Sequence, residues 1–147
     1  MREQQDPRSV DAEHSRPSGV DDTTVAALGE LSKALEAVHR ARGHLYSMHQ
    51  LIGGADATLD RVVELLREAG HDHLSARVEC ELIGRNVLPG RWTFQIVEEF
   101  DDGYYAAFQE VERAARKELA AGRRHIHEAE MKQARRTVGR PGHEATP

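Results

Sequence analysis

Apolar side chains recur at alternating steps of three and four residues early in the chain, and this spacing constrains the fold more than any other feature. Such a rhythm places side chains on one face of an α-helix and, sustained over several heptads, is typical of a helix that packs along another helix. The row consists of Leu28, Leu31, Leu35 and Val38, and the same steps continue through Arg42, Leu45, His49 and Ile52.

Residues with known terminal preferences mark both ends of this first helix. Residues 22–24 (DTT) are good N-cap types, and Gly53 and Gly54 predict its C-terminal end. A helix of about 30 residues is about 45 Å long at 1.5 Å per residue. Because that is long for a small domain, we expect either a comparably long partner helix or a second chain beside it.

Two shorter helices are predicted to follow. One begins at Asp56 or Thr58 and ends at Gly70, and the next runs from residue 71 to Gly84. Pro89 and Gly90 then form a turn that interrupts regular structure.

A fourth helix is expected from Arg91 onward. Its apolar positions fall within an arc of about 100° on a helical wheel, and they are Phe100, Tyr104, Phe108, Val111, Ala115 and Leu119. The stretch WTFQIV at its start could form a strand, but no second strand is available to pair with it. Whether the helix continues through Gly122 stays open. The fold class we predict is all-α, a helical bundle in which two long helices frame a short helical hairpin.

Both ends of the chain are polar and rich in proline or glycine. We therefore predict a disordered tail over residues 1–21, a single helical domain over 22–137 and a flexible tail over 138–147. Charged residues make up 31% of the chain, which is above the roughly 25% of an average globular domain.

Several classes of protein are disfavoured by what the sequence lacks. No stretch approaches the roughly 20 apolar residues of a membrane span, and the N-terminus has no apolar signal region. Cys80 is the single cysteine, which excludes an internal disulfide and makes a cytoplasmic location the default expectation. The motifs of P-loop, dinucleotide-binding, serine-hydrolase and zincin proteins are missing. The basic end, residues 123–140, is interrupted by acidic residues, which disfavours nucleic acid as a partner.

Arg42 and His49 interrupt the apolar row of the first helix, and three interpretations of them stay open. Arg42 could reach water where the helix projects beyond the core. Both residues could instead fix the register against a partner helix. In a functional interpretation they face an anion or a catalytic carboxylate, because a buried guanidinium is costly without one. An acid–base enzyme that uses His49 stays open with it.

Residues 85–108 combine aromatic and polar side chains more densely than the rest of the chain. Six of the seven aromatic residues lie between Trp92 and Phe108. Apolar walls with a few polar groups are typical of ligand sites and of protein interfaces, although the aromatics could simply fill the core. The predicted ligand- or partner-binding residues are Arg42, His49, Arg85, Asn86, Arg91, Trp92, Gln95, Glu99 and Tyr104.

Glu36 and His39 form an E-x-x-H pattern, which on a helix places both side chains one turn apart. This local spacing resembles that of ferritin-like di-iron bundles, which supply two such motifs and two further glutamates. Here a single E-x-x-H occurs, and a solvated pair would give the same pattern. The alternative metal ligands are Glu36, His39, Glu99, His125 and Glu128, with di-iron or di-manganese as the cofactor.

The sequence thus predicts a small cytoplasmic binding or scaffold protein with a recognition surface at residues 85–108. Its partner would be a second copy of the chain or another helical protein, with neither nucleic acid nor a membrane involved. We expect no cofactor in this leading interpretation. The alternative is a carboxylate- and histidine-rich metal-binding bundle with enzymatic activity.

Overall fold

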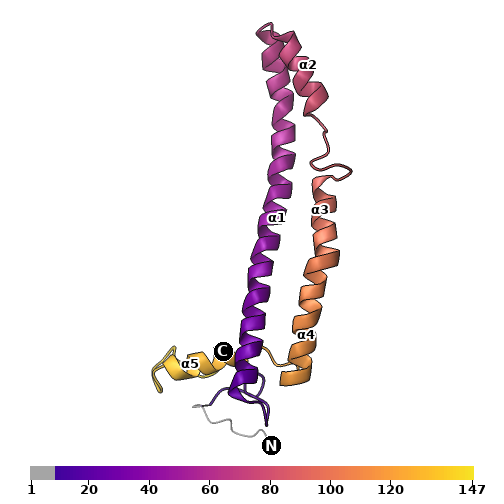
Figure 1. Ribbon diagram of the computed structural model, residues 1–147. Coiled ribbons are helices and arrows are strands. Elements are labelled where there is room, and N and C mark those ends of the chain that lie inside the picture. Colours follow the sequence, from indigo (N-terminus) through magenta and orange to yellow (C-terminus); the bar gives the residue numbers. More distant parts are fainter. Residues whose placement is uncertain (1–8) are drawn as a thin grey trace, which may run out of the picture. The chain divides into compact units, whose positions relative to one another are not determined.

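The computed structural model describes residues 9–147, and its helices confirm the predicted all-α class. In chain order, the helices are α1 (Asp22–Glu68), α2 (Asp72–Glu81), α3 (Thr93–Phe100), the π-helix η1 (Asp101–Tyr105), α4 (Ala106–Ala120) and α5 (Ile126–Arg135) (Figure 1). Residues 9–147 contain no strand, only an isolated bridge between Leu88 and Arg91. The WTFQIV stretch is accordingly helical from Thr93 onward, as expected.

The chain divides into two compact units. The first unit comprises residues up to 37 together with 107–147, and the second comprises residues 38–106. Helix α1 contributes to both of them. The predicted N-terminal tail lies partly outside the described residues, since the structure begins at Ser9.

Helix α1 is longer than the sequence pattern predicted, and its expected end at Gly53 and Gly54 is wrong. The helix spans 47 residues and passes through both glycines without interruption. It ends before Gly70, whose φ of +78° is the left-handed conformation that favours glycine. There the amide of Gly70 donates to the carbonyl of Arg67 (2.9 Å) and the amide of His71 donates to that of Leu66 (2.8 Å). These two bonds satisfy carbonyls that the last turn would otherwise leave free.

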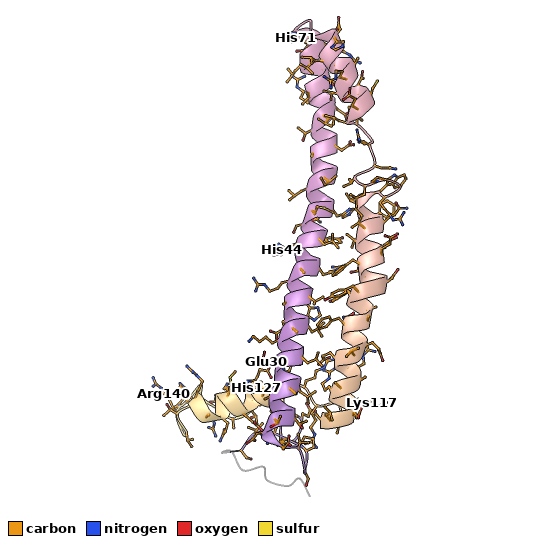
Figure 2. The ribbon with its side chains drawn as sticks, viewed as in Figure 1. Glu30, His44, His71, Lys117, His127 and Arg140 are labelled. Carbon is orange, nitrogen blue, oxygen red and sulfur yellow. The ribbon has the colours of Figure 1, made fainter. Side chains whose placement is uncertain are left out.

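In the second unit, α1 packs against α2, α3 and η1. Val38, Val63 and Val97 are its buried apolar side chains. Arg67 of α1 pairs with Glu79 of α2 at 2.6 Å, which ties the end of α1 to the returning helix. Figure 2 shows the side chains of α1 and α3 meeting between the two helices.

The first unit is built around Val25, Ala120 and Ile126, which form a small buried cluster. Helix α5 approaches α1 closely, because a Cβ atom on Gly29 would lie 3.2 Å from Cγ of His127. The chain breaks between α4 and α5, where Ala121, Gly122 and His125 have φ values of 52°, 75° and 59°. The predicted fourth helix is therefore not continuous through Gly122.

The π-helix η1 shifts the phase of the helix that follows it by one residue, because its wider turn accommodates one extra residue. The predicted apolar stripe fails for this reason at three positions. Tyr104, Val111 and Leu119 are exposed, whereas the next residue in each case is half-buried or buried, namely Tyr105, Glu112 and Ala120.

Candidate functional site

Arg42 is met by a carboxylate in the second unit. Its Nε donates to Oδ1 of Asp101 and its Nη2 donates to Oδ2, both at 3.0 Å, so the pair is bidentate. The guanidinium also lies over the ring of Tyr46, 5.0 Å from the centroid. Hydrogen bonds from Arg42 lower the pKa of the Asp101 carboxyl, and the same bonds raise the pKa of Arg42. Both side chains are about two-thirds buried, so the pair is a genuine inter-helix contact.

A second polar contact joins His39 to η1. Nδ1 of His39 lies 2.5 Å from the hydroxyl of Tyr105, and the two rings pack edge to face. The ring of Phe100 stacks on that of Tyr105, with ring planes 13° apart. Residues five apart stack in this way because a π-helix brings positions i and i+5 into line, which an α-helix does not.

His49 supplies the third contact of this row. Its Nδ1 lies 2.8 Å from Oγ1 of Thr93, at the start of α3. His49 lies seven residues after Arg42 in α1. Its partner Thr93 lies eight residues before Asp101, the partner of Arg42. The two helices are thus antiparallel here, and the polar pairs hold their register. This geometry supports the interpretation in which polar residues in the apolar row set the register of a partner helix.

After Tyr104, the most exposed aromatic side chain of the second unit is that of Trp92, directly before α3. Trp92 is 56% exposed and packs edge to face on Phe94, with ring centroids 5.4 Å apart. Leu88 is exposed as well. Nε of Arg91 pairs with Oε1 of Glu99 at 2.6 Å, also at the surface. Exposed apolar side chains and an exposed ion pair therefore both occur within the predicted segment.

The remaining predicted residues have other surroundings. Oε1 of Gln95 accepts a hydrogen bond from the amide of Trp92 (2.9 Å), so Gln95 caps α3 rather than facing a ligand. Arg85 donates to the carbonyl of Glu81 (3.3 Å) and Asn86 is exposed. Tyr104 is exposed and its ring contacts that of Phe100. The structure thus brings together Arg91, Trp92, Gln95 and Glu99 at the first turns of α3, and Arg42 and His49 on α1.

Two of the alternative metal ligands, His125 and Glu128, lie near one another, with Nδ1 and Oε2 4.0 Å apart. Glu36 is exposed on α1. His39 and Glu99 contact Tyr105 and Arg91 instead. Throughout residues 9–147 there is no group of three or more histidine, cysteine, aspartate or glutamate side chains arranged to hold a metal ion.

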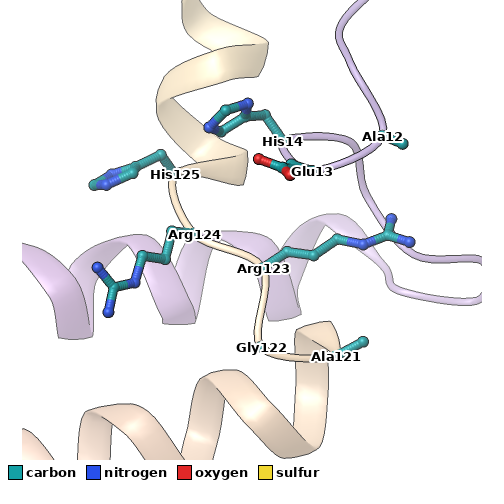
Figure 3. Close-up of a pocket in the computed structure, with 8 residues that line it drawn as sticks. All are labelled: Ala12, Glu13, His14, Ala121, Gly122, Arg123, Arg124 and His125. Carbon is teal, nitrogen blue, oxygen red and sulfur yellow. The ribbon is translucent and has the colours of Figure 1, made fainter.

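A hollow of about 530 Å³ in the first unit was not anticipated from the sequence (Figure 3). Much of its lining already has partners within the chain. Arg123 donates to the carbonyl of Ser15 (2.8 Å), and Nδ1 of His14 lies 2.6 Å from Oδ1 of Asp11. The hollow is therefore the junction at which the segment before α1 is fastened to the turn between α4 and α5. It is lined by Ala12, Glu13, His14, Ala121, Gly122, Arg123, Arg124 and His125.

No family model matches the chain, and neither a curated protein nor a solved structure shows significant similarity to it. Within the described residues, every helix is too short or too polar to traverse a lipid bilayer.

Proposed function

We propose that this chain is a small all-α binding or scaffold protein that self-associates. Its recognition surface would be the apolar patch of Leu88, Trp92 and Phe94 at the start of α3, and its partner a helical protein. A cytoplasmic location is part of the proposal, supported by the exposed single Cys80, since extracellular proteins usually hold cysteines in disulfides.

The observation that carries the proposal is the balance of buried and exposed apolar residues in the second unit. Three hydrophobic side chains are buried there, whereas eleven large ones are exposed. Isolated exposed apolar residues are normal, but so many of them around so small a core are typical of a surface that a partner covers. They are Tyr46, Leu51, Ile52, Leu65, Leu74, Leu82, Val87, Leu88, Trp92, Phe94 and Tyr104.

The patch at the start of α3 has the composition of a protein-binding site. Tryptophan is enriched among the residues that contribute most to binding, and Phe94 supports Trp92 from the side. The Arg91 and Glu99 ion pair lies within the same segment, so apolar contact area is combined with a polar rim.

Light scattering coupled to size-exclusion chromatography tests the self-association. One copy has a mass of 16.4 kDa, and we expect the measured mass to rise with concentration toward twice that value. A single-copy mass at every accessible concentration would contradict self-association.

The recognition surface is tested with a phage library of amphipathic helical peptides selected on the full chain. Peptides that bind the patch should shift the emission of the single Trp92 to shorter wavelength, because they bury it. They should lose binding to Trp92→Ala with Phe94→Ala and keep binding to the control Leu74→Ala with Leu82→Ala, which removes exposed leucines elsewhere. Peptides that bind both variants equally would contradict the proposed surface.

A further inference from the structure

Helix α1 carries a second row of residues at steps of three and four, on the face away from α3. Leu51 is nine residues beyond Arg42, which places it about 180° away around the helix, and it is 73% exposed. Figure 2 shows His44 on this side of α1. We call these positions the outer row, and they are Ala41, His44, Met48, Leu51, Ala55, Thr58, Val62 and Leu65.

The outer row is open in the second unit. Six of its eight residues are exposed, and the other two, Met48 and Val62, are half-buried. It covers 25 residues, about 37 Å of helix or three and a half heptads. Six of its eight positions are apolar, the exceptions being His44 and Thr58, and apolar residues at this spacing over three to four heptads are typical of a coiled coil.

We propose that the outer row binds the outer row of a second copy, antiparallel and centred near Gly53. This inference rests on the self-association in the proposed function and specifies its interface. In this register each layer opposes a larger side chain to a smaller one, so the two surfaces interlock. Between the first and the second copy, the layers are Ala41 with Leu65, His44 with Val62, Met48 with Thr58, and Leu51 with Ala55.

The residues that flank the outer row favour the same register. Arg40 of one copy lies beside Glu68 of the other, and symmetry makes this opposite-charge contact twice. Both residues are exposed on α1. Near the two-fold axis, Ile52 meets Ile52 on one side of the row and Gly54 meets Gly54 on the other.

Other registers lose these matches. A shift by one heptad in one direction brings Arg40 beside Arg61 of the second copy, which already pairs with Glu64 and Glu68 of its own chain, so Arg40 gains no opposite charge there. The opposite shift removes the contact between Arg40 and Glu68. A parallel pair stacks identical residues, so Ala41 and Ala55 leave gaps in the core and His44 meets His44.

Distances between spin labels test the arrangement. Cys80→Ser removes the native thiol, and nitroxides are attached at Gly43→Cys or Gly54→Cys, where an added Cβ atom meets nothing within 4 Å. In the antiparallel dimer the labels at position 54 are close together. Those at position 43 lie ten residues from the centre on each copy, which separates them by about 30 Å along the axis. Equally short distances at both positions would show a parallel pair and overturn the proposal.

Charge reversal gives an independent readout. Arg40→Glu or Glu68→Arg alone should raise the dimer dissociation constant about threefold to tenfold, as expected for two exposed ion pairs, and the double reversal should restore it. Leu51→Glu should abolish the dimer while the helical signal in circular dichroism is unchanged, because that side chain is exposed in the single chain. Gln50→Glu, exposed on the same helix and outside the outer row, is the control.

The outcomes separate this inference from the function on which it rests. A dimer with equal label distances, or one unaffected by Leu51→Glu, keeps self-association and overturns the outer-row interface. A single-copy mass without dipolar coupling overturns both, whereas the α3 recognition surface is decided by its own peptide assay.

Discussion

Replacing Gly53 and Gly54 by alanine should stabilise the protein, although a glycine pair usually signals a helix end. Both residues lie inside α1 and neither has a positive φ. An added Cβ atom at either position meets nothing within 4 Å. Alanine therefore fits without displacing a neighbour and restricts the unfolded chain more than glycine does.

The magnitude follows from helix propensity. Alanine is favoured over glycine by about 0.8–1.0 kcal/mol in a helix interior, so the double variant should gain about 1.6–2 kcal/mol. For a chain of this length, 1 kcal/mol raises the melting temperature by about 2–4 °C, so a rise of about 3–8 °C is expected.

Thermal and urea denaturation followed by far-ultraviolet circular dichroism measure this change. Gly29→Ala in the same helix is the matched control, because its Cβ atom would lie 3.2 Å from Cγ of His127. That contact is closer than ordinary packing, so the His127 side chain must shift by a few tenths of an ångström and the gain at Gly29 should be smaller than that at Gly53 or Gly54.

A lower melting temperature for the Gly53→Ala and Gly54→Ala double variant would refute the reasoning. Where a glycine ends a helix in the left-handed conformation, its replacement by alanine lowers the stability of the protein. The sign of the change therefore distinguishes one continuous α1 from two separate helices.

Two further predictions concern the contacts of α3 and η1. Asp101→Asn should lower the urea midpoint at neutral pH, and the difference from wild type should shrink as pH falls. The difference shrinks because Arg42 lowers the folded-state pKa of Asp101. The stabilisation is therefore present above the ordinary aspartate pKa and is lost as pH falls through the lowered value. A stability difference that stays constant down to strongly acidic pH would contradict this prediction. Gln95→Ala should cost about 0.5–1 kcal/mol in urea denaturation through loss of the bond from the Trp92 amide, whereas Gln50→Ala, exposed within α1, should change stability much less.

Most of α1 was predictable from periodicity, because burial of one face requires residues at steps of three and four. Leu35, Val38 and Leu45 are all half-buried or buried as that spacing requires. The predicted end of the helix at Gly53 and Gly54 is wrong because α1 tolerates both glycines in its interior. The same steps continue beyond them to Leu59, Val63 and Leu66, and packing of those residues outweighs the local cost of glycine.

The phase of α4 was not predictable from the apolar pattern. A one-residue insertion at η1 depends on tertiary contacts, namely the Asp101 carboxylate at Arg42 and the Tyr105 hydroxyl at His39. Without it Tyr104 would occupy the position that Tyr105 takes. A regular helical period of 3.6 residues does not include an inserted residue. The prediction therefore missed that the buried or half-buried positions shift by one residue at Tyr105, Glu112 and Ala120.

The contacts of Arg42 and His49 also determine which side of α1 is left for the outer row. Arg42 and His49 interrupt the apolar row, and the sequence left three interpretations of them open. In the structure Arg42 meets Asp101 and His49 meets Thr93, and neither partner could be identified from the pattern alone. These contacts hold the Arg42 and His49 side of α1 against η1 and α3, because separating a partly buried guanidinium from its carboxylate is costly. Within residues 38–106, Leu51 and the other outer-row residues are not held by comparable contacts with another helix. One helix can therefore fold through one row and associate through the other, and substitutions in the two rows should affect stability and oligomeric state independently.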